Sequence, residues 1–253
     1  MAGQTEFTDA LRKRSDQGDY WWELRACDYY REMEAPKIVT KDVADHPSSY
    51  LDLEGTFVDT TMSFLADSSY EALAILNSHV AHFHVKLSSS AFQGGFPRFK
   101  TQYLRSIPVP EWTNAEIVDL RRHAETCSNL TLTSANVALS FARRISDLCP
   151  PERDAKLSTK LRDWHELPDF AAFRAEVKKC FKADIPLNER NQWQDLFDKG
   201  KAEIEKLSAE ITRNEDEINA IVYKLFDLTT DEIALLEESI GVTKAGSRPL
   251  AVA

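Results

Sequence analysis

The segment SSSAFQGGFPRFKTQYLRSIPVP, from Ser88 to Pro110, divides the chain into two parts of different character. It contains the adjacent glycines Gly94 and Gly95, three basic residues, two glutamines and several aromatic residues, but no acidic residue. Its last five residues, SIPVP, predict a short strand that the prolines terminate, because proline has no backbone N–H to donate. Upstream of this segment the pattern is mixed, and downstream it is helical.

Upstream, short β-branched runs precede one helical pattern. PKIVTK (residues 36–41) predicts a strand opened by proline, and GTFVDTT (residues 55–61) predicts another. Apolar residues recur at close spacing between Ser69 and Lys86, which predicts one buried helix. These elements together predict a compact mixed α/β unit over residues 20–112.

Downstream, helix signals dominate. TNAE (113–116) and TTDE (229–232) are capping boxes that start helices, and Gly241 is placed to end the last one. A long helix is predicted from near Leu187. It carries a heptad seam with one polar position, formed by Ile204, Leu207, Ile211, Asn214, Ile218, Ile221 and Leu225. Packing inside the chain explains this seam most simply, and an intermolecular coiled coil is the alternative. The fold class is therefore α+β, a small mixed α/β domain followed by a helical spacer or bundle with one long helix.

The net charge of -10 is unevenly distributed. Residues 200–240 hold 4 basic against 11 acidic residues. Residues 72–110 hold no acid and the four cations Lys86, Arg98, Lys100 and Arg105. Screening limits the reach of a charge to about 8–10 Å at physiological salt, so this segment is able to meet a polyanion that the whole chain would repel. A chance gap in acidic residues is the alternative.

The glycine-containing loop has three interpretations. The first is a plain surface loop, and the second is a phosphate-binding loop that uses the backbone N–H groups of Gly94 and Gly95. The third is a loop that recognises DNA bases. In the third case Gln93 or Gln102 would bind adenine and Arg98 or Lys100 would bind guanine. The mixture of long amides, basic residues and aromatics favours nucleic acid over a small anion.

Other motifs in the chain point to structure. His79, His82 and His84 lack a nearby carboxylate, so we expect no metal site. PDFAAFRAEVK (168–178) has the letters of a nuclease motif, but its spacing predicts an amphipathic helix that starts at Pro168 and Asp169. No phosphate loop, catalytic triad or HExxH motif is present, and we expect no enzymatic activity from this chain. The separated cysteines and the lack of a long apolar run predict a cytoplasmic protein.

Three stretches carry a resemblance to a known family. They are WWELRACDYYREMEAPKIV (21–39), LAILNSHVAHFHVKLSSSAFQGGFPRFKTQYLRSIPVP (73–110) and INAIVYKLFDLTTDEIALLE (218–237). Over most of residues 20–240 the chain resembles the C-terminal target-recognition region, the TaqI-like specificity region, of type IIG restriction-modification enzymes. These are adenine-specific DNA methyltransferases, often with a nuclease on the same polypeptide, and related phage-defence methyltransferases share the arrangement.

The resemblance implies a specificity module without catalytic motifs. It makes residues 1–19 a linker from an absent catalytic domain, 20–112 a DNA target-recognition domain, and 113–253 a helical spacer domain with a disordered tail. The implied partners are double-stranded DNA and a methyltransferase, with or without a nuclease, as a domain or subunit. S-adenosylmethionine is expected in that partner and no cofactor in this chain, since NPPY-type and glycine-rich cofactor motifs are missing. The alternative is a helical protein–protein interaction module of a phage-defence complex that reads no DNA.

We expect the DNA contacts in and after the glycine loop. The expected residues are Gln93, Gly94, Gly95, Arg98, Lys100, Gln102 and Arg105. Trp22, Arg25, Tyr29 and Lys37 also match the family, either as contacts or as structural residues, and Trp22 is expected in the core. The chain departs from the family at Gln93, where relatives often have arginine, and at Pro97, which stiffens the turn. Both departures bear on which target sequence is read.

Overall fold

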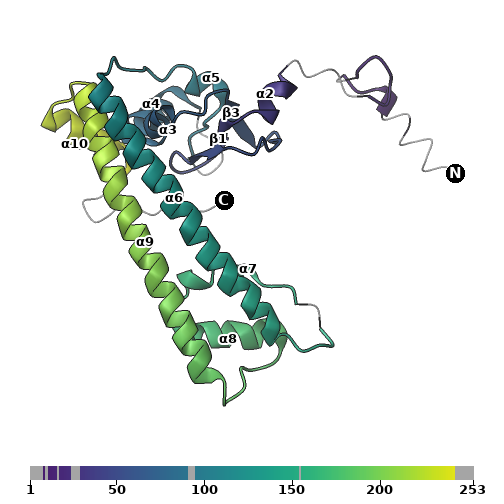
Figure 1. Ribbon diagram of the computed structural model, residues 1–253. Coiled ribbons are helices and arrows are strands. Elements are labelled where there is room, and N and C mark those ends of the chain that lie inside the picture. Colours follow the sequence, from purple (N-terminus) through teal and green to yellow (C-terminus); the bar gives the residue numbers. More distant parts are fainter. Residues whose placement is uncertain are drawn as a thin grey trace.

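The computed structural model describes Thr8 and residues 11–15, 17–23, 29–90, 95–153 and 155–242. The mixed part contains α2 (Tyr30–Glu34), β1 (Lys37–Lys41), β2 (Ser49–Asp52), β3 (Met62–Leu65), α3 (Tyr70–Asn77), α4 (His79–Ser88) and α5 (Thr101–Leu104). The helical part contains α6 (Asn114–Ile145), η1 (Ser146–Leu148), α7 (Thr159–Arg162), η2 (Trp164–Glu166), α8 (Phe170–Phe181), α9 (Arg190–Leu225) and α10 (Thr230–Ile240). The predicted α+β class is confirmed, and Figure 1 shows the mixed part beside one end of a long helical hairpin.

The sheet is antiparallel with strand order β2-β1-β3. Ile38 in β1 lies opposite Leu51 and Leu65, and these three side chains belong to the core on the helix-covered face. The strand predicted from PKIVTK is confirmed by β1. The sequence reading missed β2, because its four residues, SYLD, include no β-branched side chain and depend on β1 for pairing.

Two predicted strands are wrong. Residues 55–59 are irregular, and β3 begins only at Met62, because Gly55 has a φ of +74° and turns the chain. Residues 106–110 form no strand either. Ser106 and Ile107 belong to the turn after α5, where the Ile107 N–H donates to the Leu104 carbonyl over 3.2 Å. The prolines that follow have no N–H to pair with another strand.

The single helix predicted over residues 69–86 is divided at Ser78. The Ser78 backbone is extended (φ -72°, ψ 159°) and its N–H donates to the Ile75 carbonyl at the end of α3. Its hydroxyl oxygen accepts from the Ala81 N–H and so caps α4. One serine therefore ends one helix and starts the next, which allows α4 to turn toward α9 and α10.

Helices α6 and α9 form an antiparallel hairpin along most of their lengths (Figure 1). Both predicted capping boxes are confirmed, at Thr113 with Glu116 for α6 and at Thr229 with Glu232 for α10. The heptad seam of α9 faces α6 of the same chain. Its buried members are Ile204, Leu207, Ile211 and Ile218.

The apolar residues gather in two cores. The first combines the sheet, α3 and α4 with Leu120 of α6, Val222 of α9 and Leu236 of α10. The second lies at the far end of the hairpin, where Trp164 and Phe173 pack against Phe141. The helix predicted from Pro168 and Asp169 is confirmed by α8, whose first turn is capped by the Asp169 carboxylate. The first core therefore joins the mixed part to the hairpin.

Candidate nucleic-acid interface

The loop begins where α4 ends and returns beside β1. Gln93 and Gly94 lie outside the described residues. Gly95 has a φ of +84°, a conformation that L side chains rarely adopt. Among the described residues, its chain neighbours aside, no atom lies within 4 Å of the position that a Cβ would take. Its role is therefore in the backbone turn rather than in close packing.

After this turn the chain is fastened to the residues that follow β1. Arg98 forms an isolated antiparallel bridge with Val43, and the Phe99 N–H donates to the Asp42 carbonyl over 2.8 Å. The Phe99 side chain is buried and its ring centroid lies 6.2 Å from that of His82. Because side chains alternate along an extended segment, Arg98 and Lys100 share the side opposite Phe99.

Both cations meet the same carboxylate. The Asp42 Oδ2 atom lies 3.7 Å from Arg98 Nη2 and 3.7 Å from Lys100 Nζ. The other oxygen of Asp42 accepts from the Ser63 hydroxyl over 3.1 Å. The Asp42 side chain is 11% exposed, against 29% for Arg98 and 43% for Lys100. The loop sequence contains no acidic residue, but in the fold Asp42, which follows β1, lies beside two of its cations.

Sequence reasoning missed Asp42. No acid lies within residues 72–110, so the local pattern indicated unopposed positive charge. Its position just after the β1 strand was the available signal, but the pairing depends on a bridge between residues far apart in the chain.

A hollow of about 460 Å³ adjoins this cluster. Its walls come from the end of β1, the start of β3 and the loop, and the lining residues are Lys41, Asp42, Val43, Thr60, Thr61, Met62 and Arg98. Lys41 and Arg98 provide cationic donors and Asp42 provides an acceptor. The hollow can therefore receive a polar, electron-rich group such as a base edge or a phosphate oxygen.

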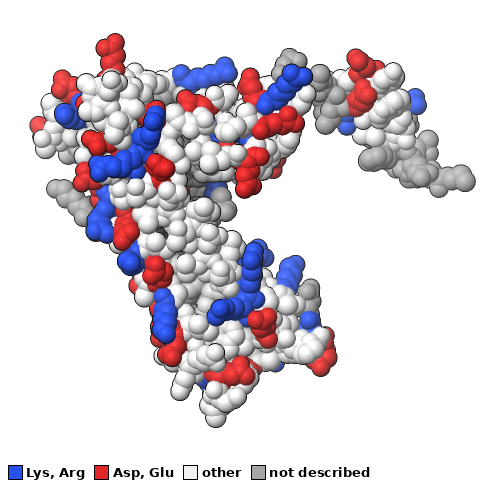
Figure 2. All heavy atoms as spheres, in the orientation of Figure 1, with Lys and Arg blue, Asp and Glu red and all other residues white. Residues whose placement is uncertain are grey.

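The short helix α5 continues the surface. Lys100 is its N-cap residue, and Gln102 and Arg105 are exposed. Hydrogen bonding with Ser90 and Gln102 lowers the pKa of Tyr103. Among the expected contact residues that are described, Arg98 and Lys100 are held together by Asp42, whereas Gln102 and Arg105 project from the next turn. Figure 2 shows basic side chains at the edge of the mixed part near α5.

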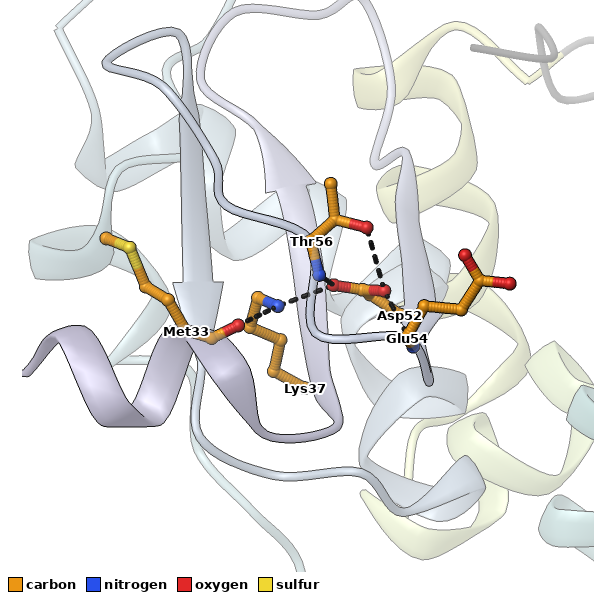
Figure 3. A network of polar contacts seen from close by, with 5 residues as sticks. All are labelled: Met33, Lys37, Asp52, Glu54 and Thr56. Atoms are coloured by element: carbon orange, nitrogen blue, oxygen red, sulfur yellow. Dashed lines mark hydrogen bonds and ion pairs between the residues drawn. The ribbon is translucent and has the colours of Figure 1, made fainter.

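Lys37 has a structural position. It is fully buried, and its Nζ donates to the Asp52 carboxylate over 2.5 Å and to the Met33 carbonyl over 2.7 Å (Figure 3). Asp52 also accepts from the backbone N–H groups of Glu54 and Thr56. Burial alone would raise the pKa of Asp52, but the bonds from Lys37 and these N–H groups outweigh it and lower the pKa. Lys37 therefore holds the turn after β2 and does not reach a ligand.

The other family-matched residues lie toward the N-terminus. Trp22 is 58% exposed and stacks on Tyr20 with a centroid distance of 4.8 Å, so the expectation of a core position is wrong. The rings of Tyr20, Trp21 and Trp22 pack against one another rather than into a hydrophobic core. Tyr29 is exposed and its ring lies 5.9 Å from that of Phe64 in β3. Arg25 lies outside the described residues.

The three histidines of α4 have separate surroundings. His79 Nδ1 lies 2.7 Å from the Tyr223 hydroxyl, and His84 Nε2 lies 3.0 Å from the Ser106 hydroxyl. His82 is buried, and burial lowers its pKa to about 4. No group of three potential metal ligands occurs among the described residues. None of the helices in the described ranges is long and apolar enough to cross a bilayer.

Two families match successive parts of the chain. The first part contains the small antiparallel sheet and the polar loop, and the second part contains the helical hairpin. Residues 3–109 match the TaqI-like C-terminal specificity domain, so this part of the chain is similar to that family. Such a domain supports sequence-specific DNA recognition in restriction-modification systems, where it acts with DNA and with methyltransferase domains. Residues 113–222 match a domain of unknown function, DUF8810. No curated protein matches the chain.

Proposed function

We propose that this chain is the specificity part of a type IIG-like restriction-modification system and contributes no catalytic step itself. Residues 95–105 read the target from the major groove, and the α6–α9 hairpin is the spacer that positions them. The observation that carries the proposal is the cluster of Arg98 and Lys100 on Asp42, because it lies inside the segment that matches a specificity domain. Guanidinium and ammonium groups are the usual donors to guanine and to phosphate.

The chemistry belongs, on this proposal, to an adenine-N6 methyltransferase that works with this chain, with or without a nuclease. That partner binds S-adenosylmethionine and flips the adenine, because the exocyclic nitrogen cannot be reached within the stacked duplex. It also supplies most of the phosphate contacts, since this chain is acidic overall and phosphate neutralisation provides much of DNA affinity. We place the system in the cytoplasm and in phage defence.

The test is selection from a duplex pool with a randomised centre, at about 50 and about 200 mM salt, with and without a candidate methyltransferase. The wild-type chain should enrich one short sequence, and the enrichment should strengthen with the partner. Arg98→Ala should relax the preference at one base pair and cost about 1–3 kcal/mol on the selected sequence. Arg105→Ala, if it removes a phosphate contact, should weaken binding to every sequence equally. No enrichment under any condition contradicts the proposal.

One observation favours a second candidate, a helical interaction module. Helix α6 carries no charged residue between Glu125 and Arg143, and Leu132 and Leu139, one heptad apart, are 63% and 55% exposed. An uncharged helical face with spaced leucines is able to pack against another protein. This candidate predicts that Leu132→Asp with Leu139→Asp abolishes a partner complex, and that the chain shows no salt-sensitive DNA binding.

A further inference from the structure

Asp42 is the central acid of the candidate interface, and its position is set by backbone contacts on both sides. Its N–H donates to the Thr61 carbonyl over 2.9 Å, and its carbonyl accepts from the Phe99 N–H. Its carboxylate reaches Ser63 with one oxygen and the two loop cations with the other. Because Asp42 is nearly buried, its carboxylate cannot turn away to solvent.

The distances indicate attraction without tight pairing. At 3.7 Å both ion pairs are longer than a hydrogen bond, so the carboxylate restrains Arg98 and Lys100 electrostatically and binds neither as a close bidentate partner. A bidentate contact between arginine and guanine requires a defined orientation of the guanidinium plane. An acid behind the arginine favours orientations in which the guanidinium stays close to it. It also cancels one of two positive charges that would otherwise attract phosphate.

We propose that Asp42 is a positioning residue that sets base selectivity by orienting Arg98 and by limiting phosphate binding through Arg98 and Lys100. The inference rests on the proposed DNA-reading function and goes beyond it, because it assigns selectivity to an acid outside the loop. The proposal predicts opposite effects of the acid on DNA affinity and on sequence selectivity. Removing the acid should strengthen binding to unrelated DNA while it weakens discrimination between sequences.

The experiment uses the full chain with Asp42→Asn, which keeps the size of the side chain and its ability to accept from Ser63. The matched control is Asp184→Asn at the far end of the hairpin. Asp184 is also one carboxylate shared by two cations, with Arg174 Nη2 at 2.6 Å and Arg190 Nη2 at 3.3 Å. Both variants raise the net charge by one, so their comparison separates the position of the acid from its charge. Circular dichroism and thermal unfolding establish that each variant is folded.

Binding is measured on the duplex selected by the wild type, on the same duplex with its guanine pairs exchanged singly, and on an unrelated duplex. Asp42→Asn should lose about tenfold in preference for one guanine position. On the unrelated duplex it should bind more tightly, with a salt dependence steeper by about 0.9 if the released cation takes up one phosphate contact. Asp184→Asn should retain the wild-type preference. Ser63→Ala, which removes the hydrogen bond to the other carboxylate oxygen, should change the preference in the direction of Asp42→Asn by a smaller factor.

Three results would overturn the inference. Equal discrimination by Asp42→Asn and the wild type would show that the acid has no part in selectivity. An equal loss of affinity on all duplexes, with lowered thermal stability, would make Asp42 a structural residue alone. A matching change in Asp184→Asn would reduce the effect to overall charge. Absence of sequence preference in the wild type is a different failure, since it contradicts the proposed function and removes this inference with it.

Discussion

The imidazole Nδ1 of His79 lies 2.7 Å from the hydroxyl oxygen of Tyr223, which joins α4 of the mixed part to α9 of the hairpin. The Tyr223 hydroxyl donates in turn to Glu237 of α10, and the backbone N–H of His79 donates to the side-chain oxygen of Asn219. A second connection is the paired contact of Arg121 in α6 with Glu71 in α3. The segments that match two different families therefore share polar contacts as well as a core.

The first prediction concerns this junction. Tyr223→Phe removes the hydroxyl and leaves His79 and Glu237 without their common partner. We expect it to lower the free energy of unfolding by about 1 kcal/mol, measured by urea denaturation. Tyr50→Phe on the exposed side of β2 is the control and should change stability by less than about 0.5 kcal/mol. Equal effects of the two substitutions would show that the His79 contact contributes nothing.

The second prediction concerns the polar position of the heptad seam. Asn214 Oδ1 lies 2.8 Å from His123 Nδ1 in α6, and the Asn214 amide nitrogen donates to the Glu210 carbonyl. Asn214→Ala and His123→Ala should each destabilise the hairpin. The double variant should lose less than their sum, with a coupling of about 0.5–1.5 kcal/mol in a double-mutant cycle. Strict additivity would mean that the two side chains do not interact in solution.

The third prediction compares two glycines in the same backbone conformation. Gly55 has a φ of +74°, and a Cβ there would lie 2.3 Å from the carbonyl oxygen of Glu34. Gly241 has a φ of +79°, but no atom of the described residues, its chain neighbours aside, lies within 4 Å of its Cβ position. Gly241→Ala should cost about 1–2 kcal/mol from backbone strain alone. Gly55→Ala should cost clearly more, because α2 must also move away. Chemical denaturation of the two variants would reveal the difference, and similar losses would exclude a steric role for Gly55.

The fourth prediction is a pH dependence. Burial, assisted by nearby Lys86 and His46, lowers the pKa of His82 from its usual 6.5 to about 4. Since the unfolded chain binds this proton more readily, the neutral histidine contributes stability above pH 6.5 that is lost as the pH falls toward 4. The loss from this residue is at most about 3 kcal/mol. His82→Gln cannot titrate, so its stability should fall less than that of the wild type between pH 7 and pH 5. Parallel profiles would contradict the assignment.

The fifth prediction is a pH dependence of stability in the opposite direction. Partial burial on α9, together with Asp216, raises the pKa of Glu215 from 4.5 to about 7. The protonated acid therefore contributes stability that is present below pH 4.5 and is lost as the pH rises through 7. Glu215→Gln resembles the protonated form and should be more stable than the wild type at pH 8 but equal to it at pH 4. Thermal unfolding at both values tests this. A variant that is less stable at pH 8 would show that the charged carboxylate is stabilising.

Local patterns predicted the helical half of the molecule well. Capping boxes at Thr113 and Thr229 depend on residues three positions apart, and the seam of α9 depends on a repeat of seven. Both patterns are complete within a few turns of chain. The strand β1 was predictable for the same reason, because its β-branched run is contiguous. The break at Ser78 was harder, since the apolar residues of α3 and α4 continue one pattern across it.

Within the candidate site, the chemical types in residues 88–110 predicted a polar, basic surface from sequence. Asp42 determines which of these cations are restrained, but it lies more than fifty positions earlier in the sequence. It comes close to Arg98 because Val43 and Arg98 form a β-bridge. In the same way Lys37 became an internal partner of Asp52 because strand register sets those two residues opposite each other. Charge pairing between distant residues requires a folded backbone, whereas periodicity, capping and composition are properties of neighbouring residues along the chain.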